Sequence, residues 1–296
     1  MMNSTRVSSM SAERALRLFE TDSELEYEEG LKSVLFERLY ETAFIEGEGI
    51  GTAYEYFVKS RCLKQLFKFN VRNVLVLGLP EKYGTSMDFV LLADQQNCNL
   101  TIVDDRDNSL EKCREVLHAL KERGFISTYP NIISVDNLLR FQSRQCFDLV
   151  LSCEVLQRLH EDDRSRYITN ALGVARYAAI FTPNKENGSH AKISKLNAMR
   201  LSELRDLFSK YQIIDAGCLD LPPFPPGLKM NRHNRSRGTH NAPADKIVMR
   251  VLDEWSRLEK LPEILKIRNS HIVFVIAANV ARHDNPPRHH VTLGIS

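Results

Sequence analysis

Short apolar runs alternate with amphipathic stretches through the middle of this chain. The apolar runs have strand length, and the stretches between them mostly carry apolar residues at helical spacing. We expect strands at 73–78, 100–104, 131–135, 147–152 and 177–182, and helices at 85–95, 108–123, 162–176 and 194–210. This alternation is typical of a parallel sheet with helices on both faces. The sequence therefore predicts an α/β, doubly wound and mostly parallel sheet.

The regions that flank this alternation differ from it. Residues 11–70 carry apolar positions at helical spacing, and a run of prolines at 222–226 excludes both a helix and a central strand. A strand at 211–219 precedes the prolines, and an amphipathic helix from Asp245 and a strand at 272–276 follow them. We expect a helical cover at 1–70, an α/β domain at 71–281 with an insertion at 222–268, and a flexible tail at 282–296.

Bulk composition excludes several classes of partner. The 296 residues are 43% hydrophobic and 26% charged, with a net charge of +2, so no overall charge favours nucleic acid or an anionic membrane. The N-terminus lacks the apolar core of a signal peptide, and the apolar run 272–278 is too short to cross a bilayer. The six cysteines form no CxxC pair, which favours reduced core thiols over disulfides or a metal site. We expect a cytoplasmic protein without a metal ion.

The turn after the first expected strand is bounded by Gly78 and Gly84. Five residues separate these glycines, and Thr85 stands where a P-loop carries its phosphate-binding lysine. A dinucleotide fingerprint requires a glycine where this chain has Pro80, and proline lacks the N–H that pyrophosphate binding uses. Neither motif fits. The segment from Thr85 to Asp88 instead predicts a capping box at the start of the next helix.

The second expected strand closes on Asp104. A carboxylate in this position can accept hydrogen bonds from ribose hydroxyls, and the neighbouring Asp105 is an alternative for the same role. Asp104 could instead cap the following helix, although Asp107 and Asn108 are better placed to do so. The strand, turn, helix and acid together predict a nucleotide-like ligand.

From Val74 to about Ala281 the chain resembles the class I S-adenosylmethionine-dependent methyltransferases. The matched segments occur in the family's order, and this succession carries the resemblance more than any single motif. They are Leu75–Gly78 with Gly84, Val103–Asp104, Val135–Asp136, Phe147–Leu156 and the apolar strands 178–184 and 272–276. The chain departs from the family pattern at Pro80, at the lengthened turn Lys82–Tyr83 and at Val76, where many relatives have an acid.

The resemblance implies a seven-stranded sheet, S-adenosylmethionine as cofactor, and methyl transfer to an unidentified acceptor. The cofactor-binding positions that it implies, or that lie beside them, are Gly78, Leu79, Pro80, Gly84, Asp104, Asp105, Asp136, Ser152, Glu154 and Tyr54. Structural roles that involve no ligand also remain open for several of these residues: Asp136 could close a loop, Glu154 could be solvated, and Tyr54 could pack a helix on the sheet. Because the glycine turn is altered, a non-catalytic binding or scaffold protein with the same fold also stays open. A third alternative, a nicotinamide-dependent oxidoreductase, is supported only by the order of strand, turn, helix and acidic residue.

The substrate side is less determined, because this family has no universal catalytic residue. His160 and His190 follow the fourth and fifth expected strands and could act as a base, although a surface histidine is the commoner outcome. The basic loop 229–237 contains Arg232, Arg235 and Arg237, which fit either a solvated loop or a lid for an anionic acceptor. We expect a small-molecule acceptor, with a protein acceptor still open and with neither nucleic acid nor a membrane as partner.

Overall fold

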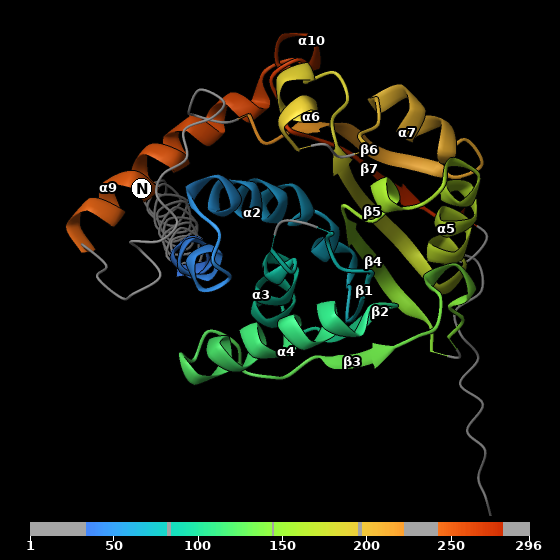
Figure 1. The fold of residues 1–296 in the computed structure, drawn as a ribbon, viewed down its shortest axis with the longest axis horizontal. Coiled ribbons are helices and arrows are strands. Elements are labelled where there is room, and N and C mark those ends of the chain that lie inside the picture. The colour runs from blue at the N-terminus through green and yellow to red at the C-terminus, as the bar shows by residue number, and fades with distance from the viewer. Residues whose placement is uncertain (1–33, 82–83, 144, 195–196, 222–241, 281–296) are drawn as a thin grey trace, which may run out of the picture.

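A seven-stranded sheet forms the centre of the computed structural model, which describes residues 34–81, 84–143, 145–194, 197–221 and 242–280 (Figure 1). The strand order is β3-β2-β1-β4-β5-β7-β6. All neighbouring strands are parallel except β7, which runs antiparallel to both β5 and β6. The strands are β1 (Asn73–Leu77), β2 (Asn99–Asp104), β3 (Asn131–Ser134), β4 (Phe147–Cys153), β5 (Ala175–Pro183), β6 (Gln212–Leu219) and β7 (Ile272–Ala278). The predicted doubly wound, mostly parallel seven-stranded sheet is confirmed.

Helices cover both faces of the sheet, and each face has its own hydrophobic core. Figure 1 shows α2, α3 and α4 on one side and α5 and α7 on the other. The helices are α2 (Ile50–Leu63), α3 (Met87–Gln95), α4 (Asp107–Glu122), α5 (Glu161–Val174), α6 (Gly188–Ser194), α7 (Leu201–Leu207), α9 (Ala242–Trp255) and α10 (Glu263–Lys266), with helical residues 34–45 ahead of α2. Strands buried on both faces explain why their sequences read as continuous apolar runs.

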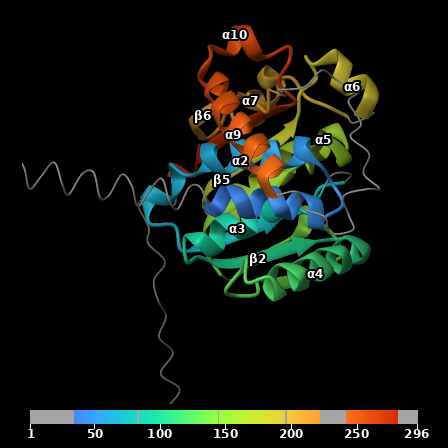
Figure 2. The ribbon, with the colours of Figure 1, turned by 90° about the vertical axis from the view of Figure 1, so that its left-hand side faces the viewer.

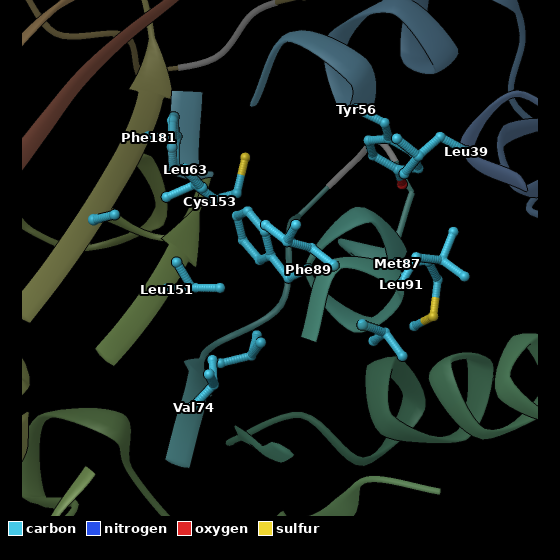
Figure 3. Packing of buried hydrophobic residues seen from close by; sticks show 14 of the residues in the cluster. Leu39, Tyr56, Leu63, Val74, Met87, Phe89, Leu91, Leu151, Cys153 and Phe181 are labelled. Atoms are coloured by element: carbon cyan, nitrogen blue, oxygen red, sulfur yellow. The ribbon is translucent and has the colours of Figure 1, made fainter. Parts of the chain in front are cut away.

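The helices α2 and α3 are held over the carboxyl end of β4 by apolar packing. Figure 3 shows Phe89 of α3 pointing toward Leu151 and Cys153 of β4 and toward Phe181 of β5. The Phe89 and Phe181 ring centroids are 6.0 Å apart, and both side chains are fully buried. Burying one such side chain stabilises a fold by about 1.5–3 kcal/mol. This packing fixes α3 against β4 and β5.

Two local predictions are wrong. The single helix expected at 194–210 is replaced by α6 and α7, because Met199 between them joins the end of β5: its N–H donates to Pro183 O at 3.0 Å, and Lys185 N–H donates to Met199 O at 2.9 Å. The capping box at the start of α3 also fails. Thr85 donates its hydroxyl to Glu46, and Asp88 pairs with Lys59 of α2, so tertiary partners replace the local cap.

Part of the expected insertion is described as α9, the 3-10 helix η4 (Ser256–Lys260) and α10, all between β6 and β7. In the view of Figure 2, α9 passes across α2. Side chains join the two regions, since Tyr40 donates its hydroxyl to Asp245 Oδ1 at 3.0 Å and Tyr54 donates to Glu259 Oε1 at 3.1 Å. Within the described ranges, no helix combines the length and the apolar character that crossing a membrane requires.

Candidate functional site

The carboxyl edge of the sheet brings together the ends of three adjacent strands. Gly78 follows β1, Asp104 ends β2, and Glu154 follows β4. Because β1 lies between β2 and β4, and all three are parallel, these residues share one edge. In open α/β sheets this edge is where ligands bind. The sequence motifs are thus adjacent in space, as the resemblance implies.

Asp104 is fully buried, and donors from its own chain reach both of its carboxylate oxygens. Oδ1 accepts from Arg106 Nε at 2.9 Å. Oδ2 accepts from Leu79 N–H at 2.6 Å, Arg106 Nη2 at 3.0 Å and Arg158 Nη2 at 3.2 Å. A ribose could therefore bind Asp104 only if the two guanidinium groups moved away.

Arg106 also ties the turn after β1 to the end of β2. Its Nη2 donates to Leu79 O at 2.7 Å and to Pro80 O at 3.3 Å. Arg158 makes a second connection, because its Nη1 lies 2.9 Å from Asp105 Oδ1. These two arginines, which the sequence did not indicate, bind the carboxylate that was predicted to hold the ribose. Only the three-dimensional reach of their long side chains places them there.

The two glycines that bound the turn are required by close packing. Gly78 has φ +80°, and a Cβ there would lie 2.7 Å from Val155 Cγ2. Gly84 has φ +63°, and a Cβ there would lie 2.1 Å from Tyr56 Oη. Positive φ values favour glycine at both positions. The space where a side chain would stand at these two glycines is therefore occupied by the side chains of Val155 and Tyr56.

A carboxylate of the helical cover lies against the turn just ahead of α3. Glu46 Oε1 accepts from Thr85 N–H at 2.6 Å, and Glu46 Oε2 accepts from Tyr56 Oη at 2.6 Å. Burial raises the pKa of Glu46, although its hydrogen bonds to Thr85 and Tyr56 oppose that shift. An N–H that could bind a ligand carboxylate is thus used within the chain.

The end of β4 presents a buried carboxylate, one oxygen of which has no hydrogen-bond partner among the described residues. Glu154 has φ +57°, its N–H donates to Phe181 O at 2.9 Å, and only 5% of the residue is exposed. Its Oε2 has no hydrogen-bond partner among the described residues. Burial raises the pKa of Glu154 to about 8, and the nearby Glu55 raises it further. Ser152, also buried, accepts from Tyr167 Oη at 2.8 Å.

Next to this position, α2 contributes the buried Lys59. Its Nζ lies 2.7 Å from Glu55 Oε1, 3.3 Å from Asp88 Oδ2 and 3.3 Å from Cys153 Sγ. Burial alone would lower the pKa of Lys59, but the neighbouring carboxylates of Asp88 and Glu55 raise it overall. Burial raises the pKa of Asp88 to about 7, opposed by Lys59. The sequence did not indicate this charged cluster, because its members come from three separate elements.

The remaining predicted residues have partners within the chain, line a separate hollow or lie outside the described residues. Tyr54 is buried on α2 and bonds Glu259 in η4. His160 is 75% exposed at the start of α5, with Nδ1 3.3 Å from Asp162 Oδ2. Asp136 lines a hollow of about 640 Å³ beside β3, which does not include Gly78, Asp104 or Glu154. Arg232, Arg235 and Arg237 fall outside the described residues, so their role as a lid stays a prediction.

A second polar group occupies the same edge at β5, β6 and β7. His190 in α6 stacks on His271, with ring centroids 4.1 Å apart and an interplanar angle of 18°. His271 precedes β7, and its Nδ1 lies 3.0 Å from Oδ2 of Asp220, which follows β6. His190 was predicted as a candidate base. His271 and Asp220 were missed, because only the antiparallel pairing of β7 with β6 brings them together.

Comparisons with known proteins find similar structures but no similar sequences. No family model matches the chain, and no curated protein matches it. Magnesium protoporphyrin IX methyltransferase from Synechocystis PCC 6803 with bound SAH aligns at TM-score 0.47 and 10% identity, over 77% of this chain and 84% of that one. The methyltransferase domain of bacterial CtHen1-C aligns at 0.47 and 14%, over 75% and 98%. The N-methyltransferase NodS from Bradyrhizobium japonicum WM9 aligns at 0.44 and 13%, over 75% and 85%.

Likenesses this distant carry no argument about activity. The architecture itself is the stronger observation, because strand order and direction are independent of sequence identity. The order β3-β2-β1-β4-β5-β7-β6 places the matched segments at Gly78, Asp104, Asp136 and Glu154 at the ends of the adjacent parallel strands β1, β2, β3 and β4, and it reverses only β7. The chain therefore has the class I methyltransferase fold.

Proposed function

We propose that this protein is an S-adenosylmethionine-dependent methyltransferase with a small-molecule acceptor. The observation that supports it best is the convergence of Gly78, Asp104 and Glu154 at the carboxyl edge of β1, β2 and β4. A second observation supports a ligand at this edge. The buried Glu154 Oε2 lacks a donor among the described residues, and a cationic or N–H-bearing ligand would supply one.

The proposed cofactor site contains the residues implied by the resemblance. The backbone at 78–80 and the Asp104 carboxylate would hold the nucleoside, and Glu154 would face its polar end. Gly84, Asp105, Asp136, Ser152 and Tyr54 complete the proposed set. When bound, the cofactor supplies an already activated methyl group on its sulfonium. The chain then has to orient the acceptor and exclude water.

Binding in this site has a cost that the structure identifies. The nucleoside would have to replace the contacts that Arg106 and Arg158 make with Asp104. Isothermal titration calorimetry with S-adenosylmethionine and with S-adenosylhomocysteine tests the proposal. We expect saturable heat for both ligands, and weaker binding in Asp104→Ala, because charge-assisted hydrogen bonds of about 1.5–3 kcal/mol are lost. Unchanged affinity in Asp104→Ala would mean that the ribose binds elsewhere.

A second candidate is a non-catalytic binding or scaffold protein that retains the fold. This candidate is favoured because side chains of the protein already contact the groups that are expected to bind the ligand. Arg106 and Arg158 bond Asp104, Val155 fills the space at Gly78, and Glu46 takes the Thr85 N–H. If calorimetry detects no binding heat at millimolar S-adenosylmethionine or S-adenosylhomocysteine, in the wild type and also in Arg106→Ala, this candidate is favoured. Saturable binding of a nicotinamide cofactor alone would instead indicate an oxidoreductase.

The remaining features belong to the same proposal. We place the protein in the cytoplasm and propose the division into a helical segment at 1–70, an α/β domain at 71–281 with an insertion at 222–268, and a tail at 282–296. The loop 229–237 would recruit an acidic part of the acceptor. Deleting it should raise the apparent Michaelis constant for the acceptor and leave S-adenosylhomocysteine affinity unchanged; equal effects on both would contradict a role as substrate lid.

A further inference from the structure

The sheet has two edge strands, β3 and β6, and only β6 carries features that protect an edge. β3 is the lowest strand in Figure 1 and pairs only with β2. At the other edge, β6 has a register shift between Ile213 and Asp215, and Asp215 adds an exposed charge. Bulges and charged side chains of this kind hinder pairing with another chain. β3 consists of Asn131, two isoleucines and Ser134, with no charge, proline or register shift.

The outward main-chain groups of β3 are available to a partner strand. Val135 N–H donates to Asp104 O at 3.2 Å, so Val135 and, by alternation, Ile133 direct their main-chain groups toward β2. Ile132 and Ser134 therefore direct their N–H and C=O groups away from the sheet. Within the described ranges, neither residue makes a main-chain hydrogen bond on that side. A row of unpaired groups of this kind is a template for an added strand.

The hollow beside β3 lies where the connection from β3 to β4 lacks a covering helix. Crossovers between parallel strands usually contain an α-helix, and here α4 joins β2 to β3 and α5 joins β4 to β5. The described part of the β3–β4 connection contains only the 3-10 helix η2 (Leu138–Arg140). The sheet beside β3 therefore keeps a hollow of about 640 Å³, which Thr101 of β2 and Ile133 of β3 help to line.

Four apolar side chains line the hollow. Phe147 is buried, whereas Ile133, Val135 and Phe141 are partly buried, and all four belong to or pack against the same hydrophobic core. Successive side chains of a strand point to opposite faces of a sheet. In a strand added to β3, the side chain beside Ile133 would therefore lie over this hollow, while its two neighbours would point to the other face. One apolar or aromatic side chain of a partner would be buried here.

Exposed polar side chains complete the hollow and indicate the charge of the partner. Asp136 and Arg140 are exposed, and neither forms an ion pair with another residue in the part of the chain that the structure describes. The exposed amides of Gln142 and Gln145 can donate to and accept from peptide groups. A segment with one acidic and one basic side chain beside its apolar residue complements both charges. A second copy of this chain does not, because β3 itself carries no charge.

We propose that the outer edge of β3 and the adjoining hollow bind an extended segment of another protein by strand addition. The main chain of the segment pairs with Ile132 and Ser134, one apolar side chain enters the hollow, and an acidic side chain pairs with Arg140. The main-chain hydrogen bonds supply affinity, and the hollow supplies selectivity. The inference does not depend on cofactor binding, because the main-chain groups of β3 and the Arg140 side chain belong to no part of the proposed function.

The probe is a phage-displayed library of random twelve-residue peptides, selected on the full chain, followed by a fluorescein-labelled synthetic copy of the most enriched peptide. Fluorescence anisotropy compares the wild type with Ser134→Pro, Arg140→Glu and the matched control Arg114→Glu, which is exposed on α4. Proline removes the outward N–H of Ser134 and is tolerated on the solvent side of an edge strand. We expect binding roughly tenfold weaker in Ser134→Pro, through loss of a main-chain hydrogen bond. Binding should be roughly fivefold weaker in Arg140→Glu and unchanged in the control.

Hydrogen exchange followed by mass spectrometry locates the bound peptide, and the β3 segment that contains the amides of Ile132 and Ser134 should be protected. The inference is overturned if no peptide is enriched, if the peptide protects only other segments, or if it binds Ser134→Pro as tightly as the wild type. Should Ser134→Pro fail to fold by circular dichroism, Arg140→Glu decides, because its site is exposed and wild-type affinity there also overturns the inference.

Sedimentation of the chain without peptide tests the competing occupant. A concentration-dependent dimer that protects the β3 amides and is lost in Arg140→Glu or Ser134→Pro would assign this edge to a second copy and overturn the inference. A monomer that binds the selected peptide supports it. Failure of S-adenosylhomocysteine to bind would overturn the proposed function and leave this inference standing.

Discussion

Replacing Arg106 by alanine tests whether the chain's own contacts compete with a nucleoside for Asp104. The Arg106 guanidinium donates to both oxygens of Asp104 and to the carbonyls of Leu79 and Pro80. A ligand that binds Asp104 must break some of these contacts. We therefore expect Arg106→Ala to bind S-adenosylhomocysteine more tightly than the wild type, while the folded protein becomes less stable.

The size of both effects follows from the same contacts. Hydrogen bonds to charged groups contribute about 1.5–3 kcal/mol. The side chain of Arg106 is 28% exposed, so solvent screens part of this pair and the lower end of that range applies. About 1.4 kcal/mol corresponds to a tenfold change in affinity. We expect roughly tenfold tighter binding, and an unfolding free energy lower by about 1–2 kcal/mol.

Calorimetry with S-adenosylhomocysteine and urea unfolding measure the two effects on the same protein. Arg123→Ala is the matched control, because Arg123 forms an exposed ion pair with Glu41 at 3.5 Å that should contribute less than about 1 kcal/mol. Affinity that falls or stays constant in Arg106→Ala, alongside the expected loss of stability, would refute the competition. Arg106 would then only brace the turn.

Three further predictions concern the groups around this edge. Lys59→Met should lower the unfolding free energy by about 3–5 kcal/mol in denaturant titrations, because the carboxylates of Asp88 and Glu55 lose their buried cation. A loss under about 1 kcal/mol would contradict this prediction. Burial raises the pKa of Glu154 from an ordinary 4.5 to about 8. Between these two pH values the folded state therefore binds more protons than the unfolded state, and the unfolding free energy should fall as pH rises from about 4.5 to 8. Glu154→Gln should flatten that decline in pH-dependent melting, and an unchanged slope would assign it to other groups. Gly78→Ala should cost about 1–3 kcal/mol through strain and overlap, whereas Gly173→Ala in α5, with open space around it, should be neutral or stabilising by up to about 1 kcal/mol.

The local patterns of the sequence predicted the sheet well, because they reflect burial rather than contacts with particular partners. The strands at 131–135, 147–152 and 272–276 are found within two residues at each end. For β4 and β7 the reason is burial on both faces, which requires largely apolar strands. The predictions that failed depend on partners distant in sequence. Thr85 and Asp88 look like a local cap, yet Glu46 and Lys59 from the helical cover bind them instead.

The candidate site divides in the same way. Gly78 and Asp104 could be located from the sequence, because the turn and the end of a strand are local features and parallel topology brings them to one edge. Whether Asp104 is available to a ligand could not be predicted. That depends on where the long side chains of Arg106 and Arg158 reach, and their rotamers are set by surrounding packing.

The sequence by itself determined the architecture: apolar runs at strand length, amphipathic helices between them, and acids and glycines at strand ends allow one class of fold. Only the tertiary structure decided what occupies the edge of that sheet. It placed two arginines on Asp104, a buried lysine beside Cys153, and Asp220 against His271 through a reversed strand. The physical reason is the sequence separation of the groups involved. Periodicity is a local pattern and records which side of an element is buried, whereas hydrogen bonds and ion pairs depend on which residues, distant in sequence, meet at that edge.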